Sequence, residues 1–161
     1  MSPFRPVGPQ SKRTMPQSPV ILIVEDDEGH AILVRDVLET AGLNNRIVHF
    51  RDGQSVLDFL FGDGVNPPAH KGHTYVVLLD IRLPKVDGIE VLRRIKSDPE
   101  LRKLPVIMLT TTDDYREVDR CHQLGCSVYI QKPVDYEKFV EAVRRLGLFI
   151  MLLLVPPLKE P

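Results

Sequence analysis

The sequence has no tryptophan, only two cysteines, and no apolar run that approaches the roughly 18 residues of a membrane-spanning helix. Cys121 and Cys126 lie five positions apart, without the CxxC spacing of a zinc site or the pattern of a secreted disulfide framework. These absences argue against a membrane protein and a disulfide-stabilised secreted domain. We therefore expect a protein of the reducing cytoplasm.

The chain also lacks an excess of charge of either sign. Its 21 lysines and arginines nearly balance 22 aspartates and glutamates, which leaves a formal net charge of -1. Without a basic block there is no electrostatic surface for nucleic acid or an anionic membrane, so proteins or small ions are the expected partners. The length of 161 residues and an apolar content of 43% suit one α/β domain.

Short aliphatic runs alternate with stretches of helical apolar spacing from Val20 onward, which predicts βαβ units and a parallel sheet. Five helices are expected between and after the strands, and most strands are so continuously apolar that helices should cover both faces of the sheet. The expected strands are Val20–Val24, Arg46–Phe50, Tyr75–Leu79, Pro105–Thr110 and Ser127–Gln131.

Polar side chains stand where four of these strands end. Glu25 and Asp26 follow the first strand, Asp80 follows the third, Thr110 ends the fourth, and Lys132 follows the fifth. Because the carboxyl ends of parallel strands meet at one edge of the sheet, these side chains should gather there. The second strand contributes no obvious group.

The chemistry of such a cluster is specific. Three carboxylates in close proximity repel one another or bind a hard cation, and Mg²⁺ prefers oxygen ligands of this kind. Lys132 supplies a point charge suited to phosphoryl oxygens, and a carboxylate can act as the nucleophile toward phosphorus. Each residue alone could be a helix cap, a turn former or a surface side chain. Their joint occurrence favours an aspartyl-phosphate site.

Four segments, "ILIVEDD", "VVLLDIRLPKVDG", "PVIMLTT" and "YIQKP", together resemble a response-regulator receiver domain, the phosphoacceptor module of two-component signalling. The resemblance covers about Val20 to Leu146. It implies a flavodoxin-like, doubly wound five-stranded parallel sheet of order 2-1-3-4-5 with five helices. It also implies a receiver domain over residues 20–147. The Pro- and Ser-rich composition of residues 1–19 predicts a disordered segment before it.

The resemblance implies roles for the residues at the strand ends. Asp80 would be the phosphoacceptor, and Glu25 and Asp26 would be the acidic pair. Asp26, Asp80 and the backbone carbonyl of Arg82 would hold Mg²⁺. A phosphohistidine on a sensor histidine kinase would be the phosphoryl donor. The output would then be a protein contact.

The resemblance implies further roles for residues beside the acceptor. Lys132 would pair with the phosphoryl group, through a cis bond to Pro133, and Thr110 would hydrogen-bond that group once it is formed. Tyr129 stands at the position of the family's switch aromatic, although a half-buried strand aromatic is an equally good interpretation. The long cationic side chain of Arg82 could reach the phosphoryl group and alter dephosphorylation. Asp27 is expected to cap the first helix.

Two alternatives use the same residues. A phosphatase of the haloacid-dehalogenase type needs a second aspartate two positions after its nucleophile, where this chain has Arg82. A receiver with a DNA-binding output domain would need more chain than the residues that follow Leu146 provide. We therefore expect no DNA contact.

The sequence ends on an arm, residues 148–161, that contains an unbroken apolar run from Leu148 to Val155. Gly147 is expected to stop the last helix, which would leave the run without an intramolecular core to fill. Such an ending resembles stand-alone receivers that partner bacterial phytochromes. We expect the arm to cross to a second copy and form a homodimer; the alternative is that it folds back on its own domain.

Overall fold

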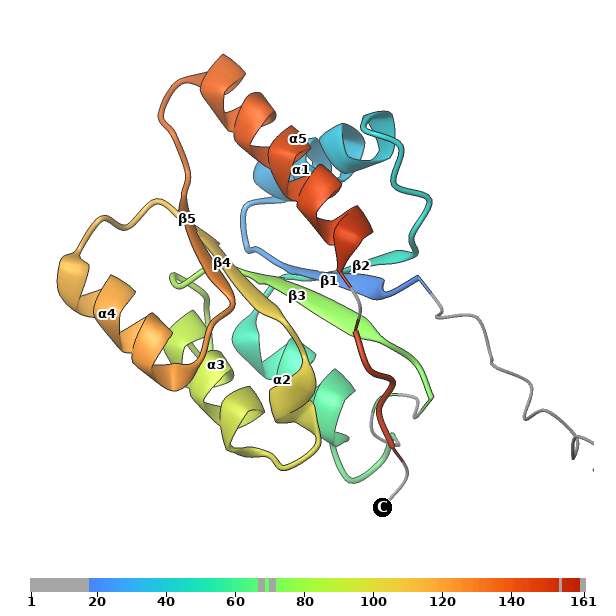
Figure 1. Cartoon of the computed structure of the whole chain (residues 1–161). Helices are drawn as coiled ribbons and strands as arrows, with labels where there is room; N and C mark the ends of the chain where they lie inside the picture. The colour runs from blue at the N-terminus through green and yellow to red at the C-terminus, as the bar shows by residue number, and fades with distance from the viewer. Residues whose placement is uncertain (1–17, 67–68, 70–71, 154, 160–161) are drawn as a thin grey trace, which may run out of the picture.

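The computed structural model describes residues 18–66, 69, 72–153 and 155–159, and the expectation of disorder for residues 1–19 falls almost wholly outside them. The described residues form a five-stranded parallel sheet of order β2-β1-β3-β4-β5, which confirms the expected fold (Figure 1). Its strands are β1 Val20–Val24, β2 Ile47–Phe50, β3 Tyr75–Leu79, β4 Val106–Thr110 and β5 Val128–Gln131. Its helices are α1 Glu28–Thr40, α2 Gly53–Phe61, α3 Gly88–Ser97, α4 Tyr115–Leu124 and α5 Tyr136–Leu152, with a 3₁₀ turn at Leu101–Lys103.

Helices cover both faces of the sheet, as the apolar strands predicted. Figure 1 shows α1 and α5 on one face and α2, α3 and α4 on the other. Alternate residues of each strand enter the two cores: Leu22 and Val24 pack toward α2 and α3, whereas Ile21 and Ile23 pack toward α1 and α5. Because each strand is buried on both sides, its register is strongly specified.

An aspartate side chain caps the first turn of every one of these five helices. The caps accept backbone N–H groups of the first turn and are Asp27, Asp52, Asp87, Asp114 and Asp135. The expected cap role of Asp27 is confirmed. A capping carboxylate accepts a hydrogen bond from an otherwise unpaired N–H group and interacts favourably with the helix dipole. These five aspartates therefore have a structural role, whereas Asp26 and Asp80 cap none of these helices.

The last helix does not stop at Gly147, and that expectation is wrong. Helix α5 continues to Leu152, and Gly147 is buried inside it. A Cβ on Gly147 would lie 3.0 Å from Leu43 Cδ1, so the glycine allows close packing of α5 and does not break the helix. Ile150, one turn further, is 1% exposed in the core. The apolar run therefore does fill part of an intramolecular core.

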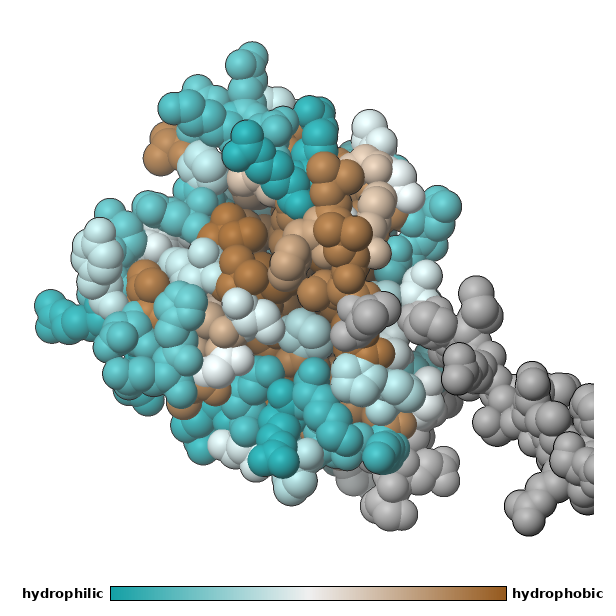
Figure 2. Space-filling model, viewed as in Figure 1, coloured by the Kyte–Doolittle hydropathy of each residue, from teal (hydrophilic) through white to brown (hydrophobic). Residues whose placement is uncertain are grey.

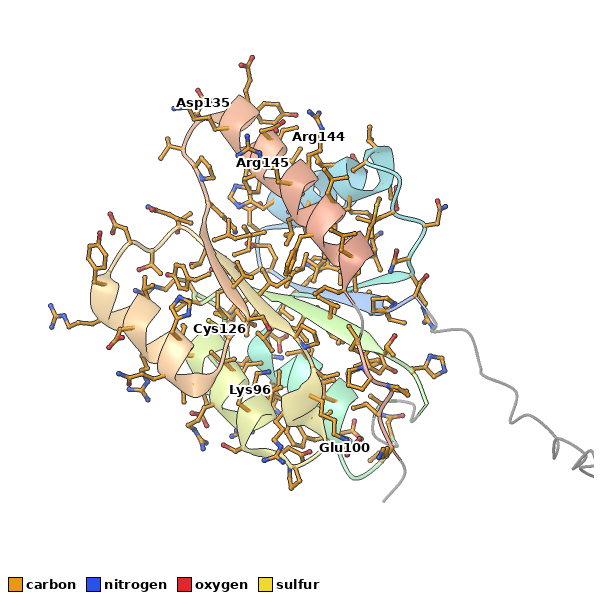
Figure 3. The ribbon with its side chains drawn as sticks, viewed as in Figure 1. Lys96, Glu100, Cys126, Asp135, Arg144 and Arg145 are labelled. Carbon is orange, nitrogen blue, oxygen red and sulfur yellow. The ribbon has the colours of Figure 1, made fainter. Side chains whose placement is uncertain are left out.

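The described residues beyond α5 run past the end of the sheet where β3 begins and reach its other face (Figure 1). Leu158 is buried in the core beneath α2 and α3. Its N–H donates to the His73 carbonyl at 3.1 Å, and the Lys159 N–H donates to Glu100 Oε1 at 2.7 Å. Figure 3 shows Glu100 beside this tail. The described part of the arm is thus held on its own domain.

Part of the apolar run nevertheless remains exposed. Figure 2 shows brown residues gathered over the C-terminal half of α5, whereas Arg144 and Arg145 mark its polar earlier turns in Figure 3. We name this surface the α5 apolar patch; it comprises Leu148, Phe149, Met151 and Leu152, which are between 40% and 80% exposed. None of the described helices is long and apolar enough to cross a membrane.

Candidate functional site

Backbone hydrogen bonds continue the sheet by one residue and align the predicted site at its carboxyl edge. The Asp80 N–H donates to the Val24 carbonyl at 3.1 Å, and the Lys132 N–H donates to the Thr110 carbonyl at 2.7 Å. The ends of β1 and β3, and those of β4 and β5, are therefore level with each other. This register carries the polar residues that follow the strands to one place.

A buried cluster of charges occupies that place. The Lys132 ammonium donates to Glu25 Oε2 at 2.5 Å and to Asp80 Oδ2 at 3.2 Å. All three side chains are at most 8% exposed. Charges removed from water are stable only when they are paired and hydrogen-bonded, so Lys132 holds the two carboxylates together.

One ammonium does not balance this site. Asp26, which is exposed, places a carboxylate oxygen within 4.8 Å of ligand atoms of Glu25 and Asp80. Burial raises the pKa of the Glu25 carboxyl to about 7, against the lowering effect of Lys132, and the Asp80 carboxylate adds to the rise. Three neighbouring carboxylates, two of them paired with one lysine, form an oxygen-rich donor set that fits a hard divalent cation.

Thr110 adds a hydroxyl with no partner. Its side chain is 0% exposed, and among the described residues its Oγ1 is the one fully buried side-chain polar atom without a hydrogen bond. A buried hydroxyl without a partner is destabilising. A hydrogen-bond acceptor brought close to this hydroxyl would therefore be stabilising.

The loop after Asp80 needs a glycine. A Cβ on Gly88 would lie 2.0 Å from the Asp80 carbonyl oxygen, which no side chain tolerates. The Gly88 N–H donates to the Ile81 carbonyl at 2.8 Å and closes the loop against the strand. The Asp-Gly pair thus starts α3, with Asp87 as its cap, and allows the loop to lie against the acceptor strand.

A second set of contacts surrounds Tyr129. Its hydroxyl donates to the Thr112 carbonyl at 3.1 Å, and Thr112 Oγ1 donates to Glu117 Oε2 at 2.8 Å. Burial raises the pKa of Tyr129 to about 12, and the carboxylates of Glu117 and Asp80 contribute to that rise. Tyr129 is half-buried, which agrees both with a switch aromatic and with an ordinary strand aromatic.

Most predicted site residues are brought together. Glu25, Asp26, Asp80 and Lys132 form one cluster, and Thr110 adjoins Lys132 through the backbone. The Arg82 N–H lies 3.4 Å from Asp80 Oδ1. The expected cis bond before Pro133 is wrong, since the described residues contain no cis peptide.

Two contributions were not foreseen. His49 of β2, the strand that seemed to offer nothing, contacts the Glu25 carbonyl with its Nε2 at 2.7 Å. The pairing of Ile23 with His49 places it there, and that register is not readable from the sequence. Glu117 lies in a helix whose acidic first turn is unremarkable by sequence, and only the fold brings it near Tyr129.

The chain matches the family model for the response regulator receiver domain over residues 21–144, and it belongs to that family. A probable methanogenesis regulatory protein, FilR2 of Methanothrix harundinacea, is 38% identical over 130 residues, which are 79% of this chain and 80% of that protein. This is a family of two-component signalling receivers. Members bind a divalent metal, and the acidic cluster fits that property.

Similar solved structures include the following three. A receiver domain from Rhodospirillum rubrum superposes with a TM-score of 0.83 at 47% identity and covers 88% of this chain and 99% of its own. The Mn²⁺-bound response regulator Rcp1 has a TM-score of 0.77 at 32% identity, with coverages of 86% and 99%. The bacteriophytochrome response regulator RtBRR has a TM-score of 0.67 at 35% identity, with coverages of 90% and 84%.

The raised pKa of Glu25 predicts a pH dependence of stability in the absence of metal. The ordinary pKa is 4.5 and the folded value is about 7, so the folded state binds more protons between these values. The free energy of unfolding should therefore fall as pH rises through this window. Relative to Glu25→Gln, the parent should lose on the order of 2 kcal/mol between about pH 5 and pH 8.

Urea unfolding of both proteins across this range measures the difference. Glu28→Gln, a change at an exposed residue that pairs with Arg51, is the matched control and should keep the parent's profile. Parallel profiles for the parent and Glu25→Gln would contradict a raised pKa of the buried Glu25 carboxyl.

Proposed function

We propose that this receiver accepts a phosphoryl group on Asp80 from the phosphohistidine of a sensor histidine kinase. The observation that carries the proposal is the Asp80 carboxylate itself, which lies 3.2 Å from the Lys132 ammonium, at the sheet edge where Thr110 ends β4 with an unpartnered hydroxyl. That arrangement provides a nucleophile, a cation and a hydrogen-bond donor at one edge of the sheet.

The transfer is an in-line displacement at phosphorus. A carboxylate oxygen of Asp80 forms the new O–P bond while the P–N bond to the donor imidazole breaks, and the imidazole nitrogen leaves with the electron pair. Lys132 is positioned to pair with the phosphoryl oxygens, because its ammonium already contacts the acceptor. The second partner of Lys132, Glu25, keeps the ammonium oriented during the exchange.

The metal of the proposed site is Mg²⁺. Asp26, Asp80 and the backbone carbonyl of Arg82 would hold it, with Glu25 as the second member of the acidic pair. When bound, the ion supplies positive charge that offsets the charge on the phosphoryl oxygens. The acidic cluster supports this assignment through its three carboxylates.

The response follows from the new charge. A phosphoryl group of about -1.5 to -2 would recruit the free hydroxyl of Thr110, and the loop that begins at Thr111 would move with it. Tyr129 contacts that loop at Thr112, so it is the proposed switch residue. Repacking of α4 and β5 would then present a changed surface to a protein partner, in the cytoplasm and without DNA contact.

The proposed donor is a bacteriophytochrome kinase. The similarity to RtBRR, at 35% identity over most of both chains, supports this choice. The phosphatase alternative is disfavoured by Arg82, whose guanidinium pairs with Glu117 where that enzyme class needs a general acid.

The acceptor assignment predicts that Asp80→Asn abolishes phosphorylation. Incubation of the parent with Mg²⁺ and acetyl phosphate should add the mass of one phosphoryl group, read by intact mass spectrometry. Asp87→Asn is the matched control, because Asp87 is an exposed cap seven positions away and asparagine also caps helices. Uptake by Asp80→Asn at the parent's rate would refute the assignment.

We also infer a homodimer through the C-terminal arm, present before phosphorylation. The α5 apolar patch is the surface that supports it, since contiguous exposed apolar side chains on one helix mark interaction sites. An isologous contact would place the patch of one copy on that of the other. Because Ile150 and Leu158 fill the core of their own domain, the contact would use the exposed side of α5.

The double substitution Leu148→Lys and Leu152→Lys should therefore give a monomer with an unchanged fold, since both side chains are more than half exposed. Size exclusion with light scattering should show the parent as a dimer. Ile32→Lys, at an apolar residue of α1 with 54% exposure, should remain dimeric. A doubly substituted protein that stays dimeric would disprove a role for the patch.

A further inference from the structure

An ion pair joins the loop after the acceptor strand to α4. Arg82 Nη2 lies 2.9 Å from Glu117 Oε1 and 3.2 Å from Glu117 Oε2, so both carboxylate oxygens face one guanidinium nitrogen. The Arg82 side chain is 68% exposed, whereas that of Glu117 is only 20% exposed. The glutamate is therefore fixed in the structure, and the arginine is the movable partner.

The fixed partner belongs to the contacts around Tyr129. Glu117 Oε2 accepts the Thr112 hydroxyl, and the Thr112 carbonyl accepts the Tyr129 hydroxyl. These contacts hold the β4–α4 loop from three sides: from α4, from β5 and, through Arg82, from the β3–α3 loop. Thr110 enters the same loop from the end of β4, so movement of Thr110 toward Asp80 must disturb them.

The movable partner begins next to the acceptor. The Arg82 N–H lies 3.4 Å from Asp80 Oδ1, and Lys132 is already committed to Asp80 and Glu25. Arg82 is thus a cation beside the acceptor that is not bound to the buried cluster. A phosphoryl group carries more charge than a carboxylate and offers acceptors to which a guanidinium bonds in forked geometry.

We propose that the Arg82–Glu117 ion pair is a latch that phosphorylation of Asp80 opens. The phosphoryl group takes the Arg82 guanidinium from Glu117, and α4 and the Thr112 loop lose their tie to the β3–α3 loop. This inference rests on the proposed function, since it needs a phosphoryl group on Asp80. Arg82 acts on the phosphoryl group directly, and Glu117 is a positioning residue.

The exposure of the pair suits such an exchange. Partly exposed ion pairs are weak and readily broken, so a latch of this kind can bias two states without locking either. Two contrasting explanations exist: Glu117 could simply repel an anion through space, or the pair could be an ordinary surface contact with no influence on the site.

A double-mutant cycle separates these explanations. The probe is beryllofluoride, a stable anionic mimic of the phosphoryl group, titrated at saturating Mg²⁺ into the full chain. Glu117→Gln removes the charge but keeps an oxygen that can accept from Thr112. It should tighten beryllofluoride binding about two- to fivefold. In the Arg82→Gln background the same change should have no effect, because no guanidinium remains to be released.

The other possible outcomes of the cycle decide between the latch and its alternatives. Equal tightening in both backgrounds would indicate through-space repulsion and overturn the latch, as would no effect in either. If the parent binds beryllofluoride but the effects of the two substitutions simply add, the latch is refuted and the proposed function stands. If the parent does not bind the probe at all, the proposed function fails and the latch with it. Glu90→Gln, which breaks an ion pair of α3 with Arg93 and Arg94, should match the parent.

A second readout examines the variant without metal or probe, which are needed only for the parent's reference spectrum. In the free protein, Glu117→Gln should shift the backbone amide resonances of Thr112 and Arg116 toward the positions that they take in the probe-bound parent. Resonances that stay at the free parent's positions would show that Glu117 does not hold the loop, and would overturn the latch.

Discussion

A buried lysine between two buried carboxylates is the interaction on which the rest of the structure depends. Lys132, Glu25 and Asp80 come from three different strand ends, and each is almost wholly removed from water. Such charges are tolerated only with close partners, so the strands must keep the register that brings them together. The cluster leaves an excess of negative charge with Asp26 beside it, and that excess is the basis of the proposed cation site. The same buried charges therefore constrain the strand register and form the proposed site.

Much of this could be predicted from the sequence because the relevant signals are local. Continuous apolar strands indicated a parallel sheet, and a parallel sheet brings its carboxyl ends to one edge. The residues that follow those strands, such as Asp80 and Lys132, were thereby placed together without knowledge of any contact. The strand bounds were right to within a residue; Pro105, for example, precedes β4, as its missing N–H favours.

The remainder depends on contacts between segments distant in the chain. Gly147 resembled a helix stop, but its neighbours Leu38 and Leu43 make it a packing position inside α5. Leu158 enters a core that no periodicity connects with the tail. Glu117 meets Arg82 only because α4 starts beside the β3–α3 loop. In each case the sequence showed the residue, and only the fold shows its partner.

The most direct test of the charge imbalance is calorimetric titration of Mg²⁺ into the parent, Asp26→Asn and Asp27→Asn. Asp26 is an exposed member of the acidic cluster, whereas its neighbour Asp27 caps α1. If the cluster binds the cation, Asp26→Asn should lower the Mg²⁺ affinity about tenfold or more, because a charged ligand is lost from a site with few of them, and Asp27→Asn should leave it near the parent's value. Equal Mg²⁺ affinity in all three proteins would contradict the account.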